Sequence, residues 1–453
     1  MITIFMKKIH FNRFLFVGLM AFCVMIATTS CKFEEDDFFP ESASLRVEHA
    51  IDNVQTILST PENGWVMQYF CGTGVAQFEG FNLYAKFDKN GKVTLAGNHR
   101  MLRNGNANKY TEATSLYSLL LEDGPVLAFN TWNDVLTPFV DPVNPWAAPN
   151  NIVKDGEGMG GDHNFVVLSY KDDEVILRGE RHGAEVRLTK CPTSWADYIA
   201  DTDKMKNYIT NTSITSYYVI DDTDTLYFTG LRNGRFRYCE NLTNPVKLDS
   251  LACVFTPQGF RTEKVDSINT HKFHEFTLVP DSSHLVSTDG AVKVMATWDN
   301  YIIGHTAVWG MDDALFTAEQ KELFDKINSE IKTFNTAWSL ASFGIGQSSG
   351  SNKVIGLVLT FYTNAAKTKT NTAGVSLTMK RTGMGQVNIS HTQEDKVDKN
   401  MENIVKKAPE VETFVRSFAN LLNGTYNITP DNYFLPTGAM FTAVSGGSTF
   451  KLN

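Results

Sequence analysis

The chain has 453 residues, of which 42% are hydrophobic and 12% aromatic, and its formal net charge is −9. This length predicts two or three domains, each large enough to bury its own core. The acidic balance argues against nucleic-acid binding, which depends on clustered Lys and Arg side chains.

The N-terminal segment has the features of an export signal. Basic residues precede the apolar run Phe14–Ala27, and Thr28, Thr29 and Ser30 follow it. A basic start, a short apolar run and small residues before a cleavage site are typical of a signal peptide. The run is shorter than the ~20 residues that span a bilayer, so residues 1–30 are predicted to be removed.

Cys31 directly follows this segment and is predicted to be a lipid anchor. A lipoprotein signal ends at a cysteine whose thiol is acylated, although Thr28 stands where leucine is usual. The alternative is an ordinary secretory signal beside a coincidental cysteine. The acidic residues Glu34–Asp37 lie in a predicted tether, residues 31–40, which acts as a spacer from an acidic membrane surface or as a sorting label.

Residues 41–191 are predicted to form a helix followed by a lipocalin-like barrel. Apolar residues at helical spacing favour a helix over Ser42–Leu58. Alternating runs joined mostly by short turns then favour an antiparallel meander of eight strands, which can close into a barrel that is filled or holds one small ligand. The predicted strands are Trp65–Phe70, Phe81–Phe87, Lys92–Ala96, Ser115–Leu121, Val126–Trp132, Asn164–Tyr170, Glu174–Arg178 and Glu185–Lys190.

Residues 192–453 are predicted to form a second β-rich α+β domain with flanking helices and a sub-boundary near residue 311. Helices are expected over Ser194–Ile209, after the capping box Thr317–Gln320, and over Val411–Leu422. The order of a helix followed by a meander recurs, but the residues themselves do not repeat. Predicted strands are Ser216–Ile220, Thr225–Thr229, Phe236–Cys239, Ala252–Phe255, Val354–Phe361 and Val375–Met379.

The cysteines beyond Cys31 predict no zinc site, because none stands in a CxxC pair. Cys239 and Cys253 are close enough to flank a hairpin, where they form either a disulfide or two buried thiols. Cys71 and Cys191 follow the first and eighth strands of the predicted barrel. They should therefore lie at opposite ends, too far apart to be bonded.

The first predicted domain contains the stretches NGWVMQYF (Asn63–Phe70), YAKFDKNGKVTL (Tyr84–Leu95), GPVLAFNTWND (Gly124–Asp134) and GGDHNF (Gly160–Phe165). These stretches resemble an uncharacterised family of Bacteroidetes surface lipoproteins, a domain of unknown function. The similarity covers about residues 40–190. It implies a surface accessory role, because genes of that family often neighbour starch-utilisation-type outer-membrane uptake systems. The acidic run after Cys31 also resembles the label that directs such lipoproteins to the outer face of the outer membrane.

Two catalytic patterns occur without the context that they need. Gly346–Gly350 matches GxSxG, but a β-type run follows it where a nucleophile elbow requires a helix. His274–Leu278 begins like HExxH and lacks the second histidine. We therefore predict no catalytic residues, no metal site and no cofactor.

The connection Asn133–His163 is much longer than the other predicted turns, and such loops are usually functional or disordered. One interpretation is a ligand flap over the barrel end, with Trp132, Trp146 and Asp162 at the binding site. The alternative is a packed lid that plugs the barrel, with both tryptophans in the core.

The combined prediction is a cell-surface accessory protein anchored in the outer membrane through Cys31 and facing the exterior. It would bind a small molecule, a glycan or a peptide for an uptake system, without catalysis. The alternatives are a secreted hydrolase with an unrecognised site and a structural or adhesive surface protein.

Overall fold

The computed structural model describes residues 41–72, 77–142, 158–211, 214, 216–239, 247–281, 283–296 and 307–453. The chain divides into two compact units, residues 1–53 and 54–453. Helix α2 (Ala43–Ser59) begins in the first unit and ends in the second. The predicted anchor Cys31 lies outside the described residues.

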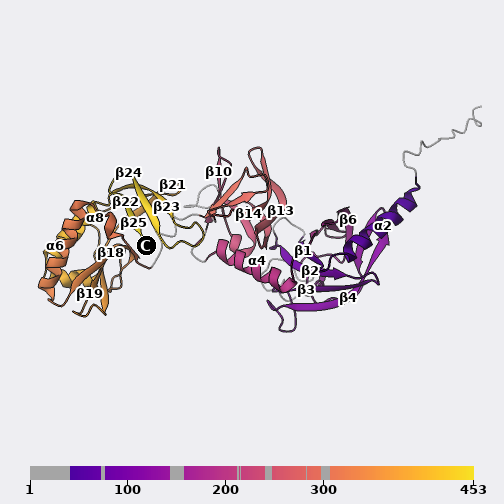
Figure 1. Cartoon of the computed structure of the whole chain (residues 1–453), viewed down its shortest axis with the longest axis horizontal. Helices are drawn as coiled ribbons and strands as arrows, with labels where there is room; N and C mark the ends of the chain where they lie inside the picture. Colours follow the sequence, from indigo (N-terminus) through magenta and orange to yellow (C-terminus); the bar gives the residue numbers. More distant parts are fainter. Residues whose placement is uncertain are drawn as a thin grey trace, which may run out of the picture. The chain divides into compact units, whose positions relative to one another are not determined.

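The first barrel confirms the predicted meander. Its strands follow chain order, and β1 closes the barrel by pairing with β8, from Trp65 opposite Lys190 to Phe70 opposite Glu185 (Figure 1). Each predicted strand is present, with ends that differ by at most a few residues. The strands are β1 Trp65–Phe70, β2 Phe81–Phe87, β3 Lys92–Gly97, β4 Thr111–Leu121, β5 Pro125–Phe129, β6 Asn164–Tyr170, β7 Glu174–Gly179 and β8 Glu185–Lys190.

The long connection between β5 and β6 supplies part of the first barrel's core. Its short helix α3 (Thr137–Val140) places the fully buried ring of Phe139 5.2 Å from Tyr69 and 4.7 Å from Phe81, between ring centroids. Val135 and Met159 belong to the same core. The described ends of the connection therefore pack as a plug, and residues 143–157 lie outside the description.

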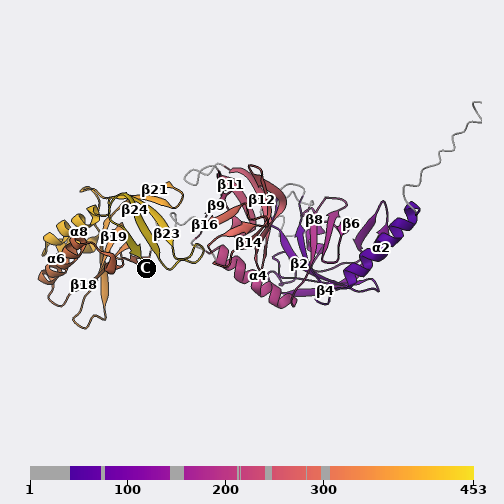
Figure 2. The same ribbon diagram turned by 45° about the horizontal axis from the view of Figure 1, so that its top comes forward.

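Strands β9 to β16, within residues 216–296, form a second closed barrel, which was predicted only as a β-rich region. Helix α4 (Trp195–Ile209) precedes it and lies against β12 and β13 (Figure 2). Strand β9 closes the barrel by pairing with β16, with Val219 opposite Val294. The strands are β9 Ser216–Ile220, β10 Thr225–Thr229, β11 Arg235–Cys239, β12 Lys247–Thr256, β13 Gly259–Ile268, β14 His271–Leu278, β15 Leu285–Ser287 and β16 Lys293–Ala296, and the 3-10 turn η1 spans Leu231–Asn233.

Stacked rings fill the second barrel. Phe228 lies between Tyr217 and Phe236, at centroid distances of 4.8 and 3.5 Å. The Tyr217 hydroxyl donates a 2.6 Å hydrogen bond to the carbonyl of Ile209, the last residue of α4. The helix end is thus tied to the barrel interior, which satisfies one of the carbonyls that a helix terminus leaves free.

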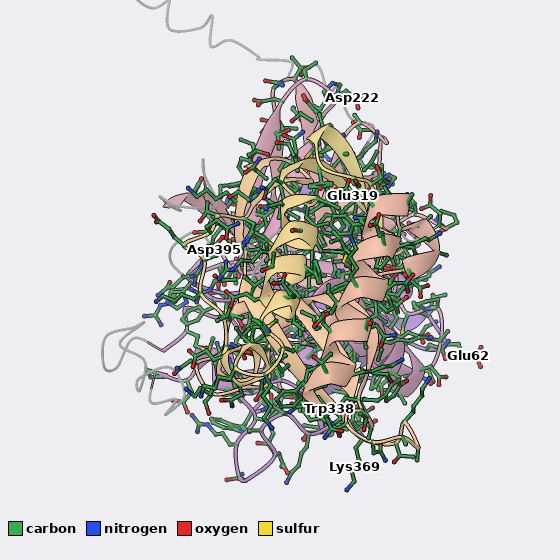
Figure 3. The ribbon with its side chains drawn as sticks, turned by 90° about the vertical axis from the view of Figure 1, so that its left-hand side faces the viewer. Glu62, Asp222, Glu319, Trp338, Lys369 and Asp395 are labelled. Carbon is green, nitrogen blue, oxygen red and sulfur yellow. The ribbon has the colours of Figure 1, made fainter. Side chains whose placement is uncertain are left out.

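The C-terminal region contains two antiparallel sheets, β17–β20 and β21–β25, together with three helices. Helices α6 and α8 lie side by side, and Glu319 stands in the first turn of α6 (Figure 3). The predicted capping box of Thr317 and Gln320 is confirmed. The elements are β17 Trp309–Gly310, η2 Asp313–Leu315, α6 Ala318–Phe334, β18 Ser339–Gln347, β19 Ile355–Tyr362, β20 Thr370–Ser376, β21 Thr378–Gly383, β22 Gln386–Ser390, α7 Lys399–Val405, α8 Glu410–Asn420, β23 Gly424–Pro430, β24 Ala439–Gly446 and β25 Phe450–Leu452.

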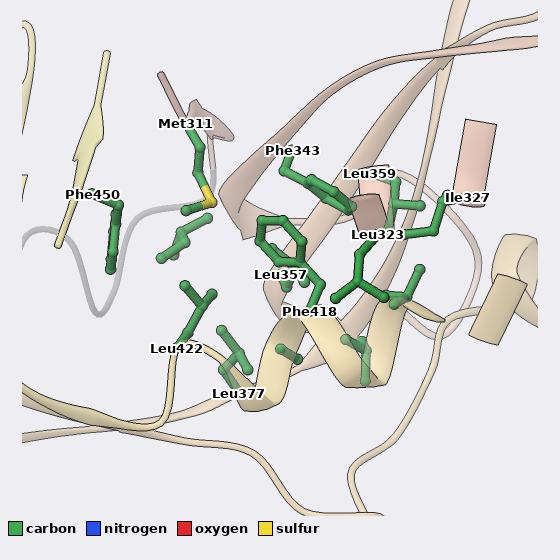
Figure 4. Close-up of a cluster of buried hydrophobic side chains, with 14 of the residues drawn as sticks. Met311, Leu323, Ile327, Phe343, Leu357, Leu359, Leu377, Phe418, Leu422 and Phe450 are labelled. Atoms are coloured by element: carbon green, nitrogen blue, oxygen red, sulfur yellow. The ribbon is translucent and has the colours of Figure 1, made fainter. Parts of the chain in front are cut away.

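The helices of this region cover an apolar core (Figure 4). Phe418 of α8 packs against Phe343 of β18 with ring centroids 4.2 Å apart. The GxSxG stretch follows β18 as a hairpin loop, in which the buried Ser348 hydroxyl accepts from the Val354 backbone N–H at 3.2 Å. That serine holds the loop together, in agreement with a Gly/Ser turn.

The cysteines confirm one prediction and resolve another. Cys71 and Cys191 are free, buried thiols at the ends of paired strands β1 and β8, and the Cys191 N–H donates to the Gly64 carbonyl at the far end from Cys71. Cys253 is also a free, buried thiol, so it forms no disulfide with Cys239 in this structure. Burial raises the pKa of the Cys253 thiol, which keeps it protonated and unreactive.

Candidate ligand-binding site

Trp132, one of the predicted ligand residues, lies on the surface after β5. Its ring is 55% exposed, and its indole N–H donates to Asp134 at 2.7 Å. The guanidinium carbon of Arg103 lies 5.6 Å from the centre of the ring. Trp132 is therefore outside the barrel core, whereas the predicted site residue Trp146 lies outside the described residues.

Asp162, the third predicted residue, is 3% exposed and hydrogen-bonded to backbone. Its carboxylate accepts from the N–H groups of Arg181 at 3.1 Å, His182 at 3.0 Å and Ala184 at 3.2 Å. These bonds fix the turn between β7 and β8. Trp132 and Asp162 thus have separate partners, and the acceptor capacity of Asp162 is largely used within the fold.

A cavity lies elsewhere, where the first barrel meets α4 and the second barrel. It has a volume of about 500 Å³, and most of its lining is polar. The first barrel contributes Glu79, Gly80, Phe81, Asn82, Tyr84, Asn98, His99, Arg100 and Asn108; α4 contributes Ile199, Thr202, Asp203 and Lys206; the second barrel contributes Arg232, Asn233, Gly234, Cys253 and Phe255.

A backbone hydrogen bond joins the two barrels within the lining of this cavity. The Gly80 N–H donates to the Cys253 carbonyl at 3.2 Å, and the Cys253 N–H donates to the Gly234 carbonyl at 2.9 Å. A Cβ added at Gly80 would collide with the ring of Phe70 and lie 2.5 Å from a methyl carbon of Val254. The Phe70 and Val254 side chains thus leave no room for a Cβ at position 80, which favours glycine there.

Charges of both signs line the cavity. The Arg100 guanidinium lies 2.9 Å from the Glu79 carboxylate. Lys206 places its ammonium 5.2 Å from the centre of the Phe255 ring, a cation–π geometry. Burial raises the pKa of Asp203, while the nearby Lys206 opposes that shift.

Amide, imidazole and hydroxyl groups complete the lining. Asn82 donates to the Phe255 carbonyl at 2.8 Å, and its buried Oδ1 has no hydrogen-bond partner among the described residues. His99 Nε2 lies 3.0 Å from the Val135 carbonyl, and burial lowers the pKa of His99 to about 4. At neutral pH this histidine is uncharged, with its proton on Nε2, where the carbonyl can accept it. The buried hydroxyl of Thr202 also has no described partner.

This combination suits binding of a polar ligand through several directional hydrogen bonds. Concave sites with convergent charged, amide and aromatic groups are the common form of small-molecule sites. Within the part of the chain that the structure describes, no group of three or more His, Cys, Asp or Glu is placed to hold a metal ion, and no helix is long and apolar enough to cross a membrane.

The protein contains two consecutive closed barrels with a polar cavity at their junction. By its fold it is therefore a β protein with two barrels. Residues 35–280 match the family described as Domain of unknown function (DUF4302). Because the match covers more than half of the chain, the protein belongs to this family. The match continues past residue 190 through β14, so it includes the cavity. A search of the curated proteins found no match.

Sequence reasoning missed this cavity because its residues come from segments far apart in the chain. The one local signal was the stretch Asn98–Asn108, which is dense in asparagine and arginine for a loop between two strands. Such a loop can equally be solvated. Only its position against α4 and η1 shows that it borders a cavity.

Proposed function

We propose that the protein is a binding protein of the cell surface that captures a small, hydroxyl-rich polar ligand in the cavity at the barrel junction. The observation that carries this proposal is the lining itself, where Asn82, Asn98 and Asn108 lie with Lys206 and Arg232 in one space of about 500 Å³. Amide groups both donate and accept, which matches the hydroxyl groups of a sugar.

The rings of Phe81, Tyr84 and Phe255 give the cavity apolar surface beside these polar groups. A sugar presents hydroxyl edges and C–H faces, so it can use both kinds of surface. The partly satisfied groups Asn82 Oδ1 and Thr202 Oγ1 are consistent with a site whose hydrogen bonding is completed when a ligand enters.

The proposal includes lipid anchoring through Cys31 at the outer membrane, facing outward, and delivery of the ligand to a starch-utilisation-type transporter. The signal-like residues 1–30, the cysteine that follows them and the acidic run Glu34–Asp37 support it. Protease shaving of intact cells should digest the wild-type protein, and Cys31→Ala should leave the membrane fraction. A Cys31→Ala protein that stays membrane-bound would exclude the anchor.

The ligand test is calorimetric titration of the full chain with a panel of mono- and oligosaccharides. Lys206→Gln should weaken the binding of any sugar found by about tenfold, since it removes a charged hydrogen-bond donor. Lys204→Gln is the matched control, because Lys204 is exposed on the same helix and does not line the cavity.

A second pair of variants tests the opposite wall. Asn98→Ala should weaken binding, whereas Asn106→Ala, in the same loop but outside the lining, should not. Sugar affinity that is equal in the wild type, Lys206→Gln and Asn98→Ala would place the site elsewhere. Failure of every sugar in the panel to bind would reject the ligand class.

A further inference from the structure

A second cavity, of about 270 Å³, shares no lining residue with the first. Its lining combines apolar side chains with the charged side chains of three arginines and one glutamate. Leu168, on the exposed side, is 57% accessible, which leaves the cavity open to a ligand. The lining consists of Phe70, Leu168, Ile176, Leu177, Arg178, Glu185, Val186, Arg187 and Arg261.

Arg261 is the unusual member of this set. Its side chain comes from β13 of the second barrel, and the residue is only 8% exposed. One terminal nitrogen, Nη1, donates to the Gln68 side-chain oxygen at 2.9 Å, while the buried Nε has no hydrogen-bond partner among the described residues. A guanidinium has five N–H donors, and the one on Nε is unused within the described residues.

The charge of Arg261 also has no close counter-ion. Ion pairs of the described residues join Arg187 to Glu174 and to Glu275, the latter at 3.3 Å, and none of them includes Arg261. Burial and the neighbouring Arg187 lower the pKa of Arg261 to about 10, which still leaves it charged at neutral pH. A buried charge without a counter-ion is costly, and an anion in the cavity would remove that cost.

Carboxylates near the cavity also act on Arg261: Glu275, Glu174 and Glu185 raise its pKa, although no ion pair of the described residues joins any of them to it. Glu185 lies opposite Arg178 in the β7–β8 register, and burial raises the pKa of Glu185. The ring centre of Phe70 lies 6.0 Å from the guanidinium carbon of Arg261. An apolar surface therefore lies next to the charged group. The lining thus combines charged side chains, Arg261 among them, with apolar ones.

We propose that this cavity binds a small organic anion whose carboxylate pairs with Arg261 and whose apolar body lies against Phe70, Leu168 and Ile176. A carboxylate can accept two parallel hydrogen bonds from the planar guanidinium, whereas a group with one acceptor atom cannot. The competing explanation is that Arg261 only joins the two barrels through Gln68, in which case the cavity has no preference for a charged ligand.

The test uses sodium octanoate as the probe and 1-octanol as its uncharged equivalent, titrated against the full chain. Octanoate should bind about tenfold or more tightly than 1-octanol, because only octanoate supplies a counter-ion. Inorganic phosphate, an anion without an apolar body, should also bind more weakly than octanoate. Equal binding of octanoate and 1-octanol, or no binding of octanoate, would overturn the proposal.

Variants locate the site. Arg261→Gln should reduce octanoate affinity about tenfold, and Arg237→Gln, an exposed arginine on β11 outside both cavities, should leave it unchanged. If Arg261→Gln fails to fold, octanoate binding to Leu168→Asp tests the site instead. Position 168 is exposed and tolerates a charge, and a carboxylate at this position should repel octanoate. Unaltered affinity in Leu168→Asp would reject the site. Lys206→Gln should not change octanoate binding, so this result is independent of the sugar proposal.

Discussion

In the first barrel, the ring of Phe139 enters the core from the connection between β5 and β6, whereas in the second barrel the stacked rings of Phe228 and Phe236 come from the strands themselves. Both barrels have eight antiparallel strands in chain order. The comparison shows that one topology can be filled in two ways. Closure depends on backbone pairing, while filling depends on total side-chain volume from whatever segment can supply it.

The barrels also share the way in which each is joined to the helix before it. Trp65, the first residue of β1, donates its indole N–H to the Leu58 carbonyl in the last turn of α2 at 2.9 Å. Tyr217, the second residue of β9, donates to the Ile209 carbonyl at the end of α4. Different residues thus perform the same role in the two helix–barrel units, which explains why no residue-level repeat is visible.

The largest expected effect is on stability. It tests whether Phe139, from the connection between β5 and β6, stabilises the first barrel as much as Phe236, from a strand, stabilises the second. Phe139→Ala and Phe236→Ala should each lower the free energy of unfolding by ~3–5 kcal/mol, since both rings are fully buried. Calorimetric unfolding of the full chain provides the measurement. Trp132→Ala is the control and should change stability by less than ~0.5 kcal/mol, because that ring is exposed. A harmless Phe139→Ala would show that the connection is not part of the core.

The contact between the barrels is tested next. Gly80→Ala should destabilise the protein by ~1–3 kcal/mol, because the new methyl group would collide with Phe70 and Val254 at the junction. Gly124→Ala, where an added Cβ meets no atom within 4 Å, should be nearly neutral. Equal melting temperatures of the two variants would contradict the close approach of the backbones.

The hydrogen bonds that join each helix to its barrel are expected to contribute less to stability than the packing at Gly80. Tyr217→Phe removes one donor without changing the shape of the ring, and it should cost about 1 kcal/mol. Tyr227→Phe on the next strand is a suitable control, since that hydroxyl makes no hydrogen bond with the described residues. Trp65→Phe is expected to act in the same direction in the first barrel. If only one of the two substitutions, Tyr217→Phe or Trp65→Phe, lowered the free energy of unfolding, the two helix–barrel units would not be equivalent.

The smallest expected effect is a pH dependence that both barrels share. Burial lowers the pKa of His99 in the first barrel and of His274 in the second to about 4, from 6.5. The unfolded chain therefore binds more protons between these values, so stability is full above pH 6.5 and is lost as the pH falls toward 4. His99 should account for up to about 1 kcal/mol between pH 6.5 and 5.5.

Denaturation midpoints of the wild type and of His99→Gln, measured across that pH range, check this sign. The difference in stability between the two should shrink as the pH falls, because only the wild type must protonate a buried imidazole on unfolding. His274→Gln should show the same trend with a similar amplitude, since the pKa of His274 is lowered to about the same value. A difference that grows as the pH falls would mean that His99 is charged in the folded protein.

Alternation along the chain was sufficient to predict the strands of the first barrel, because period-two burial is a local property. The same reasoning predicted α4 and the capping box of α6, which depend on neighbouring residues. Closure of the second barrel was not predictable in this way. Strands β9 and β16 are far apart in sequence, and their pairing depends on register, which the pattern of one strand does not contain.

The sequence by itself determined the local elements and the order of helix and meander in the two barrel units. The tertiary structure decided that Phe139 fills a barrel from a loop, that Asp162 binds backbone, and that Lys206 and Asn98 share a cavity. It also decided that Arg261 is buried without a counter-ion. The physical reason is that burial and charge pairing depend on residues brought together from distant segments, and no single segment encodes its neighbours in space.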